Sequence, residues 1–135
     1  MLRLLYISDA TEGLTDDSID AILKSAAKNN PPLGITGLLV FGGGLFTQVL
    51  EGPEQSVLKK YVQVMSDPRH RNCRIVYITP TEERIFKDIS MAALEALPWE
   101  LEHIAELDAH RKETTPADAF TKLMNVFFSR LKAVP

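Results

Sequence analysis

The chain is poor in cysteine, in positive charge and in long apolar runs. Its single cysteine excludes an internal disulfide and fits a reducing cytoplasm. A net charge of -3, with no basic stripe, argues against a nucleic-acid partner. No apolar run approaches the roughly 18 residues that cross a bilayer, and no signal peptide is visible before the first predicted strand. We therefore expect a cytoplasmic protein without a membrane partner.

The residues that are present suit one folded domain of 135 residues. The sequence is 45% hydrophobic and 24% charged, which is ordinary for a globular protein. Apolar alternation predicts strands at 2–8, 35–41, 45–51 and 73–79, and a short fifth strand within 85–92. The run Gly42-Gly43-Gly44 lacks the spacing of a phosphate loop and predicts a hairpin turn.

Helical periodicity predicts two helices between these strands and two after them. The first begins after Thr15 as N-cap and ends at Asn29-Asn30-Pro31-Pro32, because proline cannot continue a helix. The second starts with Pro53 at its first position and stops at Asp67-Pro68. The tail predicts a short helix over 95–107. A stronger helix follows, with Thr115 as N-cap, Pro116 at its first position and an apolar stripe of Phe120, Leu123, Met124, Phe127, Phe128 and Leu131.

This order of elements predicts an α+β fold of the ferredoxin-like type. Its sheet has about five strands, with the first two helices on one face. The C-terminal helical pair covers the other face, because a sheet that is apolar on both sides needs two covers. We expect residues 1–93 to form the core and residues 94–135 a C-terminal helical cap or output segment.

Two polar residues lie in the apolar strands. Gln48 is within GLFTQVLEG, and a buried amide left unbonded costs about 1–3 kcal/mol. Tyr6 is within LLYIS and, taken alone, is a core aromatic by default. Because the two strands are expected to be antiparallel neighbours, the phenol and the amide can hydrogen-bond across the pair.

Five separated motifs between residues 2 and 93 share a resemblance. They are LLYIS with Tyr6, the Asn29-Asn30 pair, GITGLLV, GLFTQVLEG with Gln48, and Ser90-Met91. In this order they resemble the BLUF family, blue-light sensors that bind FAD. The resemblance implies that the two helices and the sheet hold the flavin ring between them, and that the protein is a photoreceptor rather than an enzyme.

The resemblance also implies the residues of the site. Tyr6, Gln48, Ser90 and Met91 would be photoactive, and the amides of Asn29 and Asn30 would meet the ring edge. Ile22, Phe46, Leu50 and Val64 would be apolar walls of the flavin site, and Asp67 and His70 would contact its ribityl or phosphate groups. Each set also has a purely local alternative. The asparagines can be a helix cap, Asp67 and His70 a solvated turn, and the apolar residues plain core.

The implied mechanism is an electron and proton transfer that leaves no chemical product. Light makes the flavin a one-electron oxidant, and Tyr6 gives an electron and then a proton through Gln48. The amide is left rotated or tautomerised, and its changed bond to the flavin C4 carbonyl shifts the absorption to the red. Rearrangement near Met91 would then pass to the tail, and from there to a downstream protein or a homo-oligomer formed through the stripe.

Two positions depart from the family pattern. Gln63 stands where an arginine is frequent near the ribityl or phosphate groups, and Ile89 where a tryptophan is frequent; Trp99 in the tail does not replace it. Two other functions stay open: a cofactor-free interaction domain, and a flavin-dependent redox enzyme. The histidines show no metal-ligand spacing.

Overall fold

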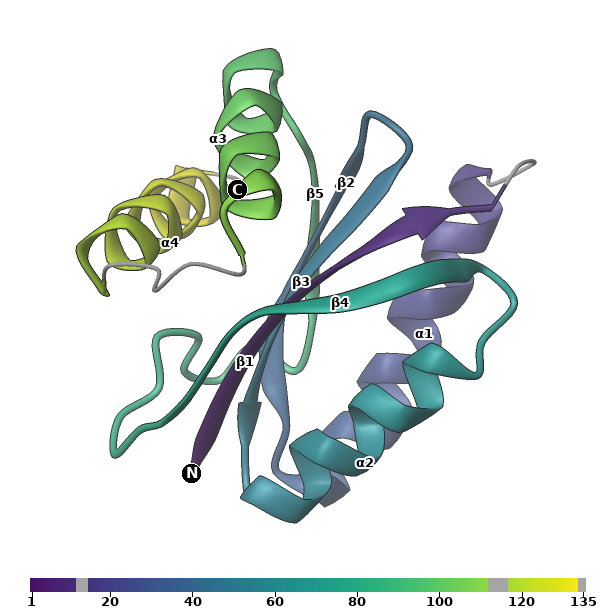
Figure 1. The fold of residues 1–135 in the computed structure, drawn as a ribbon. Coiled ribbons are helices and arrows are strands. Elements are labelled where there is room, and N and C mark those ends of the chain that lie inside the picture. Colours follow the sequence, from purple (N-terminus) through teal and green to yellow (C-terminus); the bar gives the residue numbers. More distant parts are fainter. Residues whose placement is uncertain (12–14, 112–116, 134–135) are drawn as a thin grey trace.

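A five-stranded sheet with the order β4-β1-β3-β2-β5 forms the centre of the protein. The computed structural model describes residues 1–11, 15–111 and 117–133. β1 runs antiparallel to both β3 and β4, β2 is antiparallel to β3, and β5 is parallel to β2 (Figure 1). The strands are β1 (Leu2–Ala10), β2 (Thr36–Gly42), β3 (Leu45–Gly52), β4 (His70–Pro80) and β5 (Ala92–Glu95). The predicted ferredoxin-like plan with an added strand is confirmed.

The β2–β3 hairpin fixes the register on which the site depends. Gly43 and Gly44 have φ of 61° and 75°, so both turn residues occupy the left-handed region that two-residue hairpin turns require. The predicted turn is confirmed. Pairing of β1 with β3 then places Tyr6 directly opposite Gln48. Their side chains therefore leave the same face of the sheet.

Helices α1 (Asp16–Leu33) and α2 (Glu54–Met65) cover that face, as predicted (Figure 1). Thr15 caps α1, because its side chain accepts from the Ser18 backbone N–H. Under α2, Leu4 and Leu50 pack with the buried side chains of Val57 and Tyr61. Beside α1, a separate cluster unites Ile19, Leu39 and Phe46. Tyr6 itself belongs to the cluster beneath α2.

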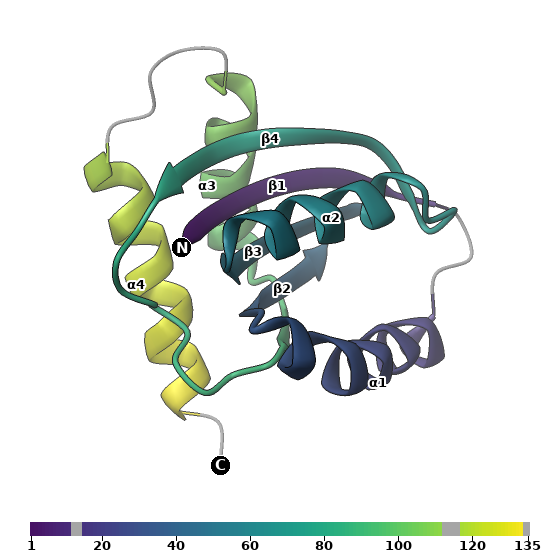
Figure 2. The same ribbon diagram turned by 90° about the horizontal axis from the view of Figure 1, so that it is seen from below.

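Helices α3 (Pro98–Ala109) and α4 (Ala117–Ala133) lie on the opposite side of the sheet (Figure 2). Arg130 of α4 bonds the buried Glu100 carboxylate at the start of α3. Thr115 and Pro116 lie outside the described residues, as does the side chain of Phe120. The core on this face combines sheet residues Leu5, Ile7, Leu38, Val40, Val49 and Val76 with Ile104, Leu123, Met124 and Phe127 of the helices.

The predicted end of the first helix is wrong. α1 continues through Pro31 and Pro32 to Leu33, because a proline in the last turn keeps a helical φ and its carbonyl can still accept a bond. Gly34, with φ of 69°, then closes the helix: its N–H donates to Pro31, and the Ile35 N–H donates to Asn30. The helix end thus rests on Gly34, and Asn30 lies inside the last turn.

Other predicted boundaries also shift. The fifth strand is β5 at Ala92–Glu95, so the predicted range 85–92 is mostly irregular and only its last residue is in the strand. β4 starts at His70 instead of 73, α3 starts at Pro98 instead of 95, and Pro53 precedes α2 instead of occupying its first position. Within the described ranges, the structure contains no helix long and apolar enough to cross a membrane.

Candidate functional site

Tyr6 and Gln48 form a buried hydrogen-bonded pair at the centre of the sheet. The Tyr6 hydroxyl donates to Gln48 Oε1, and neither side chain is more than 5% exposed. Loss of water around the phenol raises the pKa of Tyr6 well above its ordinary value of 10. The hydroxyl is therefore protonated at neutral pH and acts as the donor, which leaves Gln48 Oε1 as the acceptor.

The other end of the Gln48 amide faces Met91. Gln48 Nε2 donates to Met91 Sδ at 3.3 Å. Gly37 of β2 lies beside this contact, and a Cβ there would lie only 2.0 Å from the Val49 carbonyl oxygen of β3, so the position requires glycine. A thioether is a weak acceptor. The amide is thus held firmly at its oxygen and weakly at its nitrogen, an arrangement that a stronger partner can change.

Asn30 brings a second amide into the same region. Its side chain is fully buried, and Nδ2 donates to the Ser90 carbonyl at 2.9 Å. Asn30 Oδ1 has no hydrogen-bond partner among the described residues. A buried acceptor of this kind needs a donor. The edge of a flavin ring presents carbonyls and an N–H, so the amides of Asn30 and Gln48 fit that group.

The structure does not bring Asn29 to this group. Its side chain is exposed and donates to Ser25 Oγ at 3.1 Å, one turn earlier on α1. Ser90 contributes its backbone carbonyl to Asn30, whereas the sequence pointed to the residue as a whole. Of the predicted polar set, Tyr6, Gln48, Asn30, Ser90 and Met91 are therefore connected, and Asn29 is apart.

The residues predicted as apolar walls belong to the two clusters on this face of the sheet. Phe46 and the half-buried Ile22 belong to the cluster beside α1, whereas Leu50 and Val64 belong to the cluster beneath α2. Met91 contacts both clusters. On α2, some outward positions are apolar too: Leu58 and Met65 are 42% and 49% exposed, whereas Val57 and Tyr61 are buried.

His70 is the third polar group on this face. Its Nδ1 lies 2.7 Å from the Ser8 hydroxyl, and its ring is 4.5 Å from that of Phe46, measured between centroids. Burial lowers the pKa of His70 despite the nearby Asp67 carboxylate. Asp67 bonds the Arg69 guanidinium and backbone, and these bonds lower the pKa of its own carboxyl. The charged Asp67–Arg69 pair thus lies next to a neutral imidazole.

Sequence reasoning missed two residues of this site. Ser8 is fully buried and pairs with His70; its place on the Tyr6 face at period two was the available signal. Tyr61 of α2 meets Tyr6 edge-on, with ring centroids 5.3 Å apart. Gln63, the departure on α2, is exposed.

The lowered pKa of His70 predicts the pH dependence of stability for the flavin-free protein. The folded pKa lies below the 6.5 of a free imidazole, so the unfolded chain binds more protons in that window. The free energy of unfolding should therefore fall as the pH drops from about 6.5 through the folded pKa. Urea unfolding between pH 7.5 and 5 measures this slope. His70→Gln should flatten this slope, whereas His103→Gln, at an exposed position, should not. Equal slopes in the wild type and both variants would contradict the assignment of the pH dependence to His70.

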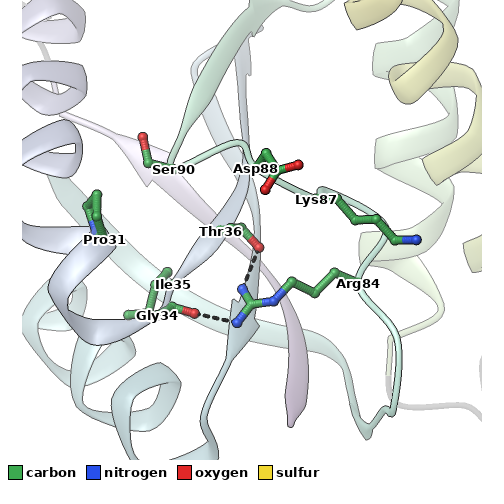
Figure 3. Close-up of a pocket in the computed structure, with 8 residues that line it drawn as sticks. All are labelled: Pro31, Gly34, Ile35, Thr36, Arg84, Lys87, Asp88 and Ser90. Atoms are coloured by element: carbon green, nitrogen blue, oxygen red, sulfur yellow. Dashed lines mark hydrogen bonds between the residues drawn. The ribbon is translucent and has the colours of Figure 1, made fainter.

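An open hollow lies next to the Asn30–Ser90 contact. Its volume is about 580 Å3, and it separates the end of α1 from the segment that precedes β5 (Figure 3). The Arg84 side chain lines this hollow and donates hydrogen bonds to Thr36 Oγ1 and the Gly34 carbonyl. The lining residues are Pro31, Gly34, Ile35, Thr36, Arg84, Lys87, Asp88 and Ser90.

Comparison with known proteins assigns this geometry to one family. A family model described as "BLUF: Sensors of blue-light using FAD" matches residues 1–92. Photoactivated adenylate cyclase subunit beta of Euglena longa is 39% identical over 86 residues, which are 64% of this chain and 10% of the relative. The subunit alpha of Euglena gracilis is 34% identical over the same share of this chain and 8% of its own length. The chain therefore spans about a tenth of these relatives.

Solved structures give the same result over more of the chain. The dark-state structure of BlrB, a BLUF protein, has a TM-score of 0.76 at 26% identity and matches 96% of both chains. A bacterial light-regulated adenylyl cyclase has a TM-score of 0.70 at 29% identity, over 93% of this chain and 39% of that one. The similarity to BlrB extends beyond the family model into α3 and α4.

Proposed function

The chain belongs to the BLUF family of flavin-binding blue-light sensors, and from this premise we propose that its flavin is FAD and that light acts through the Tyr6–Gln48 pair. The observation that carries the proposal is the buried chain of contacts from Tyr6 through the Gln48 amide to Met91. An amide that is strongly bonded at one end and weakly at the other can change its orientation.

Asn30 supports the placement of the ring. Its Oδ1 is a buried acceptor without a partner among the described residues, and its Nδ2 donates to the Ser90 carbonyl. Asn30 and Gln48 would hold the ring edge, and the walls beside them would be Ile22, Phe46, Leu50 and Val64. Asp67 and His70 would lie towards the ribityl or phosphate groups.

The residues of the chain then perform a small set of steps. Bound flavin supplies the absorption of blue light and a one-electron acceptor. Tyr6 would be the electron donor, and its hydroxyl proton would move along the existing hydrogen bond to Gln48 Oε1. The Gln48 amide turns or tautomerises before the electron and proton return to Tyr6. Gln48 then no longer presents Nε2 to Met91, and the rearranged hydrogen bonds are what the red-shifted absorption reports.

A spectrum of the purified protein tests this function. The protein should be yellow, and flavin released by denaturation should run as FAD on chromatography, with FMN as the standard to be distinguished. Blue light should shift the visible band reversibly to the red. A colourless protein that takes up no added flavin would support the cofactor-free interaction domain instead. Net reduction of the flavin by a substrate, without a red-shifted form, would support the redox enzyme.

Asn30 and Asn29 provide a matched pair for the cofactor contact. Asn30→Leu should weaken flavin binding about tenfold or more, because it removes a buried amide that would bond the ring. Asn29→Leu makes the same change on the exposed side of the same helix turn and should leave the affinity near that of the wild type. Fluorescence titration of flavin into the unloaded proteins measures both. Equal weakening in the two variants would assign the ring edge to both asparagines, as the sequence alone suggested.

The output of the sensor is a separate part of the proposal. The cyclase activity of the relatives belongs to proteins of which this chain matches a tenth, so we assign no catalytic activity to this chain. We propose instead that the signal passes from Met91 into β5 and the helices α3 and α4, and then to a downstream protein or a second copy of the chain. Light scattering of the dark and illuminated protein, repeated on Phe128→Asp, distinguishes self-association from an unrelated partner.

The cytoplasm remains the proposed compartment. Cys73 is a free, half-buried thiol, and burial raises the pKa of that thiol, which disfavours its reactive thiolate form.

A further inference from the structure

Residues 81–91, which join β4 to β5, carry three contacts with the site although they contain no helix or strand. Ile89 accepts from the Gly37 N–H at 3.1 Å, and Ser90 accepts from Asn30. Met91 accepts from Gln48. Figure 2 shows this segment running past α4 to the end of α1. Because it has no hydrogen-bond ladder of its own, its position depends on the side chains that hold it.

Glu51 holds the first half of the segment. Its carboxylate is fully buried and accepts the backbone N–H groups of Ile85 and Phe86 at 3.0 and 2.8 Å. Arg3 completes the site with a bond of 2.8 Å to Glu51 and a second to the Glu83 carbonyl. Glu51 is in the same strand as Gln48, three residues later. The segment is therefore fixed directly to the strand that carries the photoactive amide.

Arg84 joins residues 81–91 to the end of α1, the helix that carries Asn30. Its guanidinium donates to the Gly34 carbonyl at 2.7 Å and to Thr36 Oγ1 at 2.8 Å (Figure 3). It also donates to the Glu51 carbonyl at 3.2 Å. Gly34 ends α1 four residues after Asn30, and a cation is favourable at a helix C-terminus. Both sides of the Asn30–Ser90 bond are thus joined by one side chain.

We propose that Arg84 is a positioning residue of the photocycle: by joining the end of α1 to the β4–β5 segment, it keeps Ser90 and Met91 in place around the Gln48 amide. The inference rests on the proposed function. Rotation of a buried amide requires its neighbours to yield, and close-packed neighbours resist. With Arg84 in place, the segment cannot yield into the adjoining hollow of about 580 Å3. Without it, Met91 and Ser90 can move aside.

The test compares three variants of the flavin-loaded protein. Arg84→Gln should accelerate the return of the red-shifted form to the dark form at least about fivefold, the size expected from the loss of one net hydrogen bond. Arg84→Lys should fall between this variant and the wild type, because an ammonium cannot span three acceptors as a planar fork does. Lys87→Gln is the matched control, since it removes a charge from the same hollow without breaking these contacts, and should recover like the wild type.

A second readout needs neither flavin nor light. Arg84→Gln should speed amide hydrogen exchange at Phe86 and Gly37, whose N–H groups bond Glu51 and Ile89, but not at Val57 in the first turn of α2. A folded Arg84→Gln protein with wild-type exchange, or with a recovery rate that is unchanged or slower, would overturn the inference. A wild-type protein that binds flavin without a red shift would refute the proposed function, and the exchange data would then decide the role of Arg84 alone.

Discussion

Tyr6→Phe is expected to bind flavin like the wild type and to lose the reversible red shift completely. The variant lacks the hydroxyl that donates a hydrogen bond to Gln48 Oε1, and a phenylalanine ring is a poorer electron donor than a phenol. The ring itself still fills the space between Leu4, Leu50 and Tyr61. Light-minus-dark absorption spectra at equal flavin loading measure the effect.

The loss of stability in this variant should be moderate. Gln48 Oε1 is left as a buried acceptor without its donor, which costs about 1–3 kcal/mol. Urea unfolding of the flavin-free protein measures this cost separately from the photochemistry. Tyr61→Phe is the matched control, because Tyr61 packs edge-on against Tyr6 whereas the hydrogen bond to Gln48 comes from the Tyr6 hydroxyl. A red shift of normal size in Tyr6→Phe, or its loss in both variants, would contradict the role given to Tyr6.

Gln48→Leu should have an equally large effect for a different reason. It keeps the electron donor but removes the amide that links Tyr6 to Met91, so no hydrogen bond remains to be rearranged. Illumination should then produce no lasting red-shifted form, while nearly conserved side-chain volume preserves the fold. The Tyr6 hydroxyl loses its acceptor, and with its pKa already raised by burial it should stay protonated.

The same substitution at an exposed glutamine provides the control. Gln55→Leu changes the first turn of α2, away from the strands that carry the pair, and should leave the photocycle unchanged. A lasting red shift in Gln48→Leu would show that another group reports the light, and Asn30 would be the next residue to replace. Together with Tyr6→Phe, this variant separates the donor of the electron from the group that stores the change.

Much of the sheet and the centre of the site could be predicted because they depend on local periodicity. In a strand, alternate residues share a face, so the sequence allowed a hydrogen bond between Tyr6 and Gln48 on neighbouring antiparallel strands. The register of β1 against β3 then placed both side chains on the same face of the sheet. The resemblance then supplied the chemistry of that pair. The hairpin between β2 and β3 followed from three glycines in a row, since two of them must take positive φ.

Other features depended on contacts between segments far apart in the sequence. The two asparagines are adjacent in sequence, yet only the position of Asn30 in the last turn of α1 buries its side chain against Ser90. The residues before β5 are held by the Glu51 carboxylate and the Arg84 guanidinium, and not by a backbone hydrogen-bond ladder. Their sequence therefore shows no strand or helix periodicity that could predict their position. For the same reason the strand predicted within 85–92 proved to be mostly an irregular segment.

The sequence by itself therefore determined the layers of the fold, Tyr6 and Gln48 as the candidate polar pair, and the family to which the chain belongs. The tertiary structure decided which amide joins them, that Met91 receives the Gln48 nitrogen, and how the β4–β5 segment is held. The physical reason is the range of the interactions. Strand alternation and turn chemistry are set by neighbouring residues, whereas a hydrogen bond across 50 residues, such as that from Arg84 to Gly34, exists only after the chain has folded.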